Sequence, residues 1–234
     1  MPAPYEASLE YAQSLDQVDI LYAFRERFLF PQHEGQDARY FCGNSLGLQP
    51  KSAGYLMGLE LEDWAKYGVE GHFKARNPWF SYHHIFTERL SKIVGAAAHE
   101  VVAMNTLTVN LHLLMISFYR PTQERYKIIM EAGAFPSDMY AVETQVRMHG
   151  FEPDDAIIEV APRDGEYLVR DEDILQAISE GGSSLALVMF GGVNYYTGQV
   201  FDMKKITDAA HRVGAFAGFD LAHAVGNIPL QLHD

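Results

Sequence analysis

Two ionisable residues, Asp220 and His223, follow directly after the short apolar run 215–219. Such a run predicts a buried strand, and an ionised carboxylate at its end is costly to desolvate without a partner. A metal ion is one candidate partner, although no third ligand stands at a suitable spacing and His83–His84 lies far back in the chain. Hydrogen-bond donors of the backbone or of His223 are a second. The protonated nitrogen of a heterocyclic ligand is a third, because a carboxylate beside a desolvated cation favours the charged form of both.

The segment MNTLTVNLHLL, residues 104–114, places Thr106 and Thr108 where a strand is expected to pass into a helix. Hydroxyl side chains at this junction cap a helix, and the free N–H groups of the first turn attract anions. An ordinary helix cap also explains these residues, and the segment taken alone favours that interpretation. The glycine patterns of dinucleotide-binding sites and P-loops are absent from the segment. An anion site and a simple cap therefore both stay open.

The segment EAGAFPSDMYA, residues 131–141, places four candidate ligand-binding residues after another apolar run. Phe135 at a strand end is suited to stack on a planar ring or to pack in the core. Pro136 stiffens the turn, and Ser137 or Asp138 opens the next helix. In the later segment FGGVNYYTGQ, Gly191–Gly192 either lets the backbone approach a ligand closely or belongs to a surface hairpin.

The elements that must position these residues alternate along the second half of the chain. Strands are predicted for the apolar runs 101–104, 127–130, 157–160, 185–190 and 215–219, and helices for 108–119, 137–149, 171–180 and 203–213. This alternation predicts an α/β fold, a three-layer sandwich with a mainly parallel sheet. Ligands bind beyond the carboxyl ends of strands in such sheets, so the loops 105–108, 132–138, 191–198 and 220–227 are expected to share one site.

The first hundred residues carry a different pattern. Helices are predicted over 16–30, 51–67 and 79–94, with a glycine-rich turn, GNSLG, between the first two. We expect residues 1–98 to form a helical arm or cap, and residues 99–234 to form the ligand-binding domain.

The composition excludes several classes of protein. Acidic residues outnumber basic ones by 31 to 18, and the resulting net charge of −13 argues against nucleic acid as a partner. No apolar stretch is long enough to span a membrane, and no secretory signal is visible at the amino end. The single cysteine excludes an internal disulfide and favours a reducing compartment, so a cytoplasmic protein is expected.

Five segments, YFCGNSLGLQPK, MNTLTVNLHLLM, EAGAFPSDMYA, GGVNYYTGQ and GFDLAHAVGN, closely resemble the kynureninase family. The resemblance runs from about residue 21 to residue 234. It implies the large domain of a fold-type-I pyridoxal-phosphate enzyme, incomplete at its C-terminus. It also implies the hydrolysis of L-kynurenine to anthranilate and L-alanine, and of 3-hydroxykynurenine to 3-hydroxyanthranilate. The implied cofactor is pyridoxal 5'-phosphate, and the complete enzyme would be a homodimer.

The same resemblance implies roles for particular residues. Leu107 and Thr108 would meet the cofactor phosphate, and Phe135 would stack on the ring. Asp138 would lie on the pyridine side, Asp220 would pair with the ring nitrogen, and His223 would line the pocket. Pro136 and Ser137 join this cofactor-binding set, His72 resembles a substrate-contacting histidine, and no metal ligand is expected. Gly191 stands where the family often carries serine.

The Schiff-base lysine of the family is expected beyond Asp234, so we predict no catalytic residue within these 234 residues and little activity of the chain alone. Two other functions stay open. One is a non-catalytic remnant of the same fold that binds a ligand or pairs with another subunit. The other is a metal-dependent hydrolase that uses Asp220 and His223.

Overall fold

The structure is a computed structural model that describes residues 5–233, and it divides into two compact units, Met1–Tyr82 and His83–Asp234. The first unit contains α1 (Leu9–Val18), α2 (Ala53–Tyr67) and the short α3 (Gly71–Lys74). It also contains three 3₁₀ segments, η1 (Tyr22–Arg27), η2 (Gly68–Glu70) and η3 (Trp79–Ser81), and two antiparallel pairs. The pairs are β1 (Phe28–Leu29) with β4 (Gln49–Pro50), and β2 (Gln32–His33) with β3 (Gln36–Asp37).

The helix predicted over 16–30 is wrong. Helix α1 ends at Val18, because Asp19 leaves the helical conformation and its carboxylate accepts the N–H of Leu21 at 2.8 Å. A local side-chain bond of this kind competes with helix propagation. The chain then continues as the 3₁₀ segment η1 and the short strand β1.

The other two early helices are confirmed, with shifted starts. Helix α2 ends at Gly68, which has a φ of 52°. The predicted helix 79–94 begins as η3 and becomes regular in α4 (His84–Val94), which belongs to the second unit. Gly95 ends α4 in the left-handed conformation, and a Cβ there would lie 2.3 Å from the Leu230 carbonyl oxygen. Glycine is required at this C-cap for both reasons.

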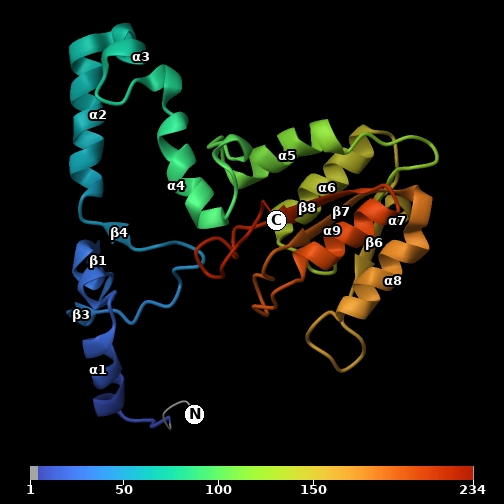
Figure 1. The fold of residues 1–234 in the computed structure, drawn as a ribbon, viewed down its shortest axis with the longest axis horizontal. Helices are drawn as coiled ribbons and strands as arrows, with labels where there is room; N and C mark the ends of the chain where they lie inside the picture. Colours follow the sequence, from blue (N-terminus) through green and yellow to red (C-terminus); the bar gives the residue numbers. More distant parts are fainter. Residues whose placement is uncertain (1–4, 234) are drawn as a thin grey trace. The chain divides into compact units, whose positions relative to one another are not determined.

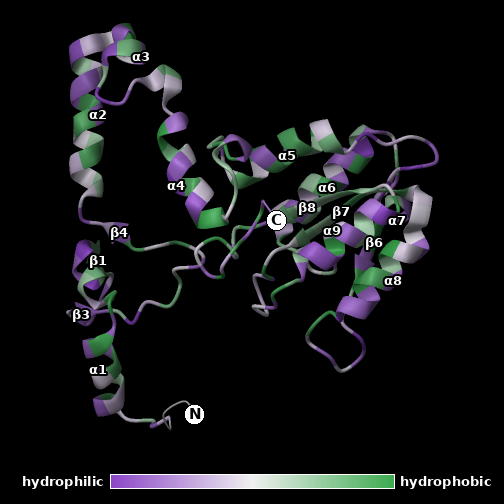
Figure 2. Ribbon diagram, viewed as in Figure 1, coloured by the Kyte–Doolittle hydropathy of each residue, from purple (hydrophilic) through white to green (hydrophobic). Residues whose placement is uncertain are grey.

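A four-stranded parallel sheet forms the centre of the second unit, in the order β6-β5-β7-β8. Its strands are β5 (Lys127–Glu131), β6 (Ile157–Val160), β7 (Leu185–Gly191) and β8 (Phe216–Asp220), each within a residue or so of its predicted run. Residues 185–190 of the central strand β7 are all buried, as expected for a strand covered on both faces, and in Figure 2 this strand has mainly the green of hydrophobic residues.

Helices cover both faces of this sheet (Figure 1). On one face lie α5 (Leu107–Phe118) and α6 (Pro136–Met148), and on the other lie α8 (Asp171–Gly181) and α9 (Met203–Arg212). The connections carry the short α7 (Pro153–Ala156) and the 3₁₀ segments η4 (Ala98–Glu100) and η5 (Gly182–Ser184). Alternate residues of one strand pack against the two helix layers. In β5, Ile128 and Met130 face α5 and α6, and Ile129 faces α8 and α9. The predicted three-layer α/β architecture is confirmed. Over residues 5–233, no helix is both long enough and apolar enough to cross a membrane.

The strand predicted over 101–104 is absent. The segment is irregular, and Val102 and Met104 are 57% and 50% exposed. A strand exists through hydrogen bonds to a neighbouring strand, and within residues 5–233 this segment pairs with none. Apolar sequence alone was therefore an insufficient predictor here.

Arg125 links the segments at the amino-terminal ends of the neighbouring strands β7 and β8. Its Nη1 donates to the carbonyl oxygens of Leu185, at 2.7 Å, and Val213, at 3.2 Å. We expect Arg125→Ala to destabilise the protein by about 1–3 kcal/mol, because two half-buried carbonyl groups lose a charged donor. Urea unfolding measures this loss, with the exposed Arg120→Ala as the matched control. Equal midpoints for the two variants would contradict the prediction.

Candidate functional site

The carboxyl ends of three neighbouring strands converge on one small pocket. Glu131 is the last residue of β5, and the last residues of β7 and β8, Gly191 and Asp220, are register partners. The first turn of α6 contributes Asp138 to the same place. The pocket is lined by Glu131, Phe135, Asp138, Gly191, Val193, Tyr195, Asp220 and His223.

Asp138 and Asp220 form a pair of neighbouring carboxyl groups that lie within hydrogen-bonding reach of each other. Strand alternation aims Asp220 at the α5–α6 layer, because Phe216 contacts Phe118 of α5 and Phe219 packs toward α8 and α9. Asp138 is 5% exposed. Burial first, and then the bond to Asp220 and its charge, raise the pKa of Asp138 to about 7. A second carboxyl group this close disfavours the ionisation of Asp138, because like charges repel.

Asp220 is also held by the backbone. Its Oδ1 accepts the Ala222 N–H at 2.7 Å, and its carbonyl oxygen accepts the Gly192 N–H at 2.7 Å. The carboxylate is thus fixed at the strand end and aimed into the pocket.

Glu131 is the third carboxylate of the site and, like Asp138, is buried, with 5% of its surface exposed; the sequence analysis did not identify it. Its Oε1 accepts the Gly191 N–H at 3.2 Å, and its Oε2 accepts the Asn194 amide at 2.8 Å. Burial raises the pKa of Glu131, while these two bonds act in the opposite direction. The available signal was an acidic residue ending an otherwise apolar strand, as at Asp220.

A cluster of three rings, from Phe135, Tyr195 and His223, lies beside the carboxylates in the pocket lining. The rings of Phe135 and Tyr195 meet edge to face with centroids 5.1 Å apart, and His223 lies 6.5 Å from Phe135 and 6.2 Å from Tyr195. Phe135 lines the pocket and is 41% exposed, so it is not fully covered by neighbouring side chains. A planar ligand ring and a positive charge both suit this environment.

The predicted phosphate residues, Leu107 and Thr108, lie in the first turn of α5. Thr106 is the N-cap residue, and its hydroxyl makes no capping bond, so the first-turn N–H groups have no side-chain acceptor from it. Neither Leu107 nor Thr108 lines the pocket itself. Helices α5 and α6 run in the same direction beside β5, which points both amino ends to the carboxyl edge of the sheet.

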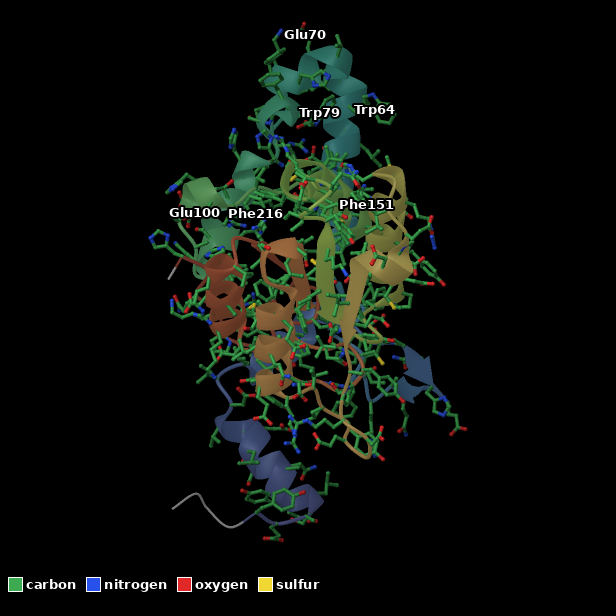
Figure 3. The ribbon with its side chains drawn as sticks, turned by 90° about the vertical axis from the view of Figure 1, so that its right-hand side faces the viewer. Trp64, Glu70, Trp79, Glu100, Phe151 and Phe216 are labelled. Carbon is green, nitrogen blue, oxygen red and sulfur yellow. The ribbon has the colours of Figure 1, made fainter. Side chains whose placement is uncertain are left out.

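Pro136 and Ser137 occupy the first turn of α6, and the Ser137 hydroxyl lies 3.5 Å from Asp138 Oδ1. They position Asp138 rather than line the pocket. His72 belongs to the first unit, where it is exposed and its ring meets Trp79 (Figure 3) edge to face at 5.6 Å.

Other chemistries find less support at this site. Within the described part of the chain, no group of three His, Cys, Asp or Glu side chains has metal-binding geometry. The residues that line the pocket include no lysine or arginine, so the acidic pair has no cationic partner there.

Comparisons with known proteins agree with this fold. Residues 62–234 match the family model described as aminotransferase class-V. The chain is 60% identical to a kynureninase of Flavobacterium psychrophilum and 54% identical to one of Myxococcus xanthus, over 98% and 100% of its own length. It spans 54% and 56% of those proteins, so about half the length of the curated relatives it matches. The resemblance to kynureninases is confirmed.

Solved structures give the same fold at low identity. The complex of the cystine C-S lyase C-DES with cysteine persulfide matches with a TM-score of 0.62 and 14% identity, over 81% of this chain and 48% of that chain. A C-DES mutant with glycine covalently linked to its PLP cofactor matches with a TM-score of 0.61 and 13% identity, over the same shares. By its sequence match and its fold, the chain belongs to the aminotransferase class-V family.

Proposed function

We propose that this chain supplies the cofactor-binding half of a pyridoxal-phosphate-dependent kynureninase. The observation that carries the proposal is the Asp138–Asp220 pair at the carboxyl edge of the sheet: Asp138 is buried, its pKa is raised to about 7, and the pocket lining contains no lysine or arginine. A protonated ring nitrogen removes the like-charge repulsion within such a pair, so the residues present fit a pyridinium group.

The remaining pocket residues fit the rest of the cofactor. Phe135 offers a partly free face on which a ring can stack, and His223 borders the same space. The first turn of α5, at Leu107 and Thr108, supplies N–H groups for the phosphate. Bound there, pyridoxal phosphate supplies an electron sink for charge that develops on the substrate. Asp220, fixed by the Ala222 N–H, holds the proton on the ring nitrogen that makes this sink effective.

The proposed reaction is the hydrolysis of L-kynurenine to anthranilate and L-alanine, with 3-hydroxykynurenine as the second substrate. The relatives named kynureninase support this assignment. The proposal includes a Schiff-base lysine from outside the 234 residues, a cytoplasmic homodimer, a cofactor domain from residue 99, and residues 1–98 as its cap. His72 is its proposed substrate contact.

A chimera tests the proposal. Residues 1–234 are joined to the part of the Flavobacterium psychrophilum kynureninase that lies outside its match to this chain. We expect the purified chimera to release anthranilate from L-kynurenine, measured by anthranilate fluorescence. We also expect the 234-residue chain alone to bind pyridoxamine 5'-phosphate, which needs no lysine, with a measurable dissociation constant.

The outcomes separate the candidate functions. Binding by the chain together with an inactive chimera favours the non-catalytic remnant of the same fold. Absence of binding in both proteins contradicts the proposed cofactor site. Stoichiometric metal that survives dialysis would instead support a metal-dependent hydrolase.

A further inference from the structure

Glu131 and Asn194 form a link between two strands that the reaction chemistry does not require. Glu131 ends β5, while Asn194 lies in the loop after β7, and the Gly191 N–H donates to the same carboxylate. Strand alternation places Glu131 with Ile129, on the side of the α8–α9 layer, and from there it borders the pocket that Asp138 and Asp220 also line. Both oxygens of this buried group are thus engaged by the loop.

The orientation of Asn194 is fixed by its other bonds. Its Oδ1 accepts the N–H groups of Tyr196, at 2.9 Å, and Thr197, at 2.8 Å, and also the Thr197 hydroxyl at 3.0 Å. The amide therefore cannot flip, and only its NH₂ group faces Glu131. Both partners of Glu131 are donors, so the link needs two acceptor oxygens, which an ionised carboxylate has and a glutamine amide lacks.

Gly191 makes room for this carboxylate. A Cβ at position 191 would lie 2.9 Å from Glu131 Oε1 and 3.3 Å from the Val193 carbonyl oxygen. Glycine at this position, in place of the serine expected from the family resemblance, is therefore matched to the close approach of Glu131.

The loop held in this way carries Tyr195, whose ring meets Phe135 and His223 at the pocket. We propose that Glu131 is a positioning residue: its ionised carboxylate fixes the loop 191–197 and thereby sets the aromatic side of the ring-binding pocket. The part that concerns the cofactor ring rests on the proposed function, whereas the part that concerns the loop does not.

Hydrogen exchange read by mass spectrometry at pH 8 tests the loop. In the 234-residue chain, Glu131→Gln places an amide NH₂ group opposite one of the two donors from which Glu131 accepts. Asn194→Asp keeps the Oδ1 bonds to residues 196 and 197 but places a second carboxylate beside that of Glu131. We expect each variant to exchange amides in peptides covering 191–199 about tenfold faster than the unsubstituted chain. Peptides of β5 and β7 change less than twofold. Glu159→Gln, an exposed glutamate on the neighbouring strand β6, is the matched control and changes nothing.

The double variant Glu131→Gln with Asn194→Asp provides a rescue. The amide introduced at position 131 then donates to the carboxylate introduced at position 194, and its carbonyl still accepts the Gly191 N–H, so the link reforms with reversed polarity. We expect exchange within about threefold of the unsubstituted chain. If Glu131 acted only by filling space, the double variant would not restore the slow exchange of the loop.

The exchange and binding results test the role of Glu131 in two separate ways. Unchanged exchange in Glu131→Gln, failure of the rescue, or acceleration throughout the sheet overturns the proposal, since Glu131 then does not act on the loop in particular. Separately, we expect Glu131→Gln to weaken pyridoxamine 5'-phosphate binding about tenfold, and the double variant to restore it. If the unsubstituted chain binds none, the proposed function fails, while the exchange data still decide the role of Glu131 in the loop.

Discussion

Asp138→Asn should make the ligand-free chain more stable at pH 8 and remove a marked pH dependence. The pKa of Asp138 is raised to about 7 by burial and by Asp220, above its usual value near 3.8. The folded state therefore binds more protons than the unfolded state between these values. Its stabilisation is complete below pH 4 and is lost as the pH rises through 7. Asparagine stays neutral and still donates to the Asp220 carboxylate.

The magnitude follows from the same shift. A raised pKa of this size corresponds to a difference on the order of 2–4 kcal/mol between pH 4 and pH 8. Urea unfolding of the two proteins across this range measures it, and the exposed Asp208→Asn controls for the loss of one nominal charge. A free energy of unfolding with the same pH profile in the Asp138→Asn variant and the unsubstituted chain would show that folding does not raise the pKa of Asp138. Saturating pyridoxamine 5'-phosphate should reduce the difference in unfolding free energy between pH 4 and pH 8, because a cationic ring stabilises the ionised pair.

Asp220→Asn should abolish most of the kynurenine hydrolysis by the chimera. We expect a loss of at least ~100-fold in kcat/KM, about 3 kcal/mol of transition-state stabilisation. The amide keeps the shape of the group and still accepts the Ala222 N–H, but it no longer balances a positive ring nitrogen. The loss should appear mainly in kcat, because the phosphate and ring-stacking contacts persist.

Two comparisons make this prediction specific. In the Asp220→Asn chimera, the pH at which the cofactor absorption band changes should differ from that of the unsubstituted chimera. A packing defect does not cause such a difference. Asp208→Asn, on the exposed side of α9, should retain full activity. Wild-type kcat in the Asp220→Asn chimera would remove the ring-nitrogen role from the proposed function.

Local sequence determined the elements that surround the site. The apolar run 157–160 became β6 without change, and helix 171–180 became α8 with one further residue. Their periodicity and end signals depend on neighbours in sequence, which is why they could be read directly. Where a longer-range condition applied, the same reasoning failed: the apolar segment 101–104 has no partner strand in the described part of the chain.

The sequence by itself determined the residue types of the site, namely carboxylates and aromatic side chains after strands, and the alternation that brings their loops to one edge. Only the tertiary structure decided which groups meet. Asp138 pairs with Asp220, and Glu131 reaches Asn194, because the strand order places β7 beside both β5 and β8. Strand order and register are set by packing between residues far apart in the chain, and a shift of one residue would turn each side chain to the opposite face. No local pattern carries that information, so the carboxyl pair and the loop link could be found only in the folded chain.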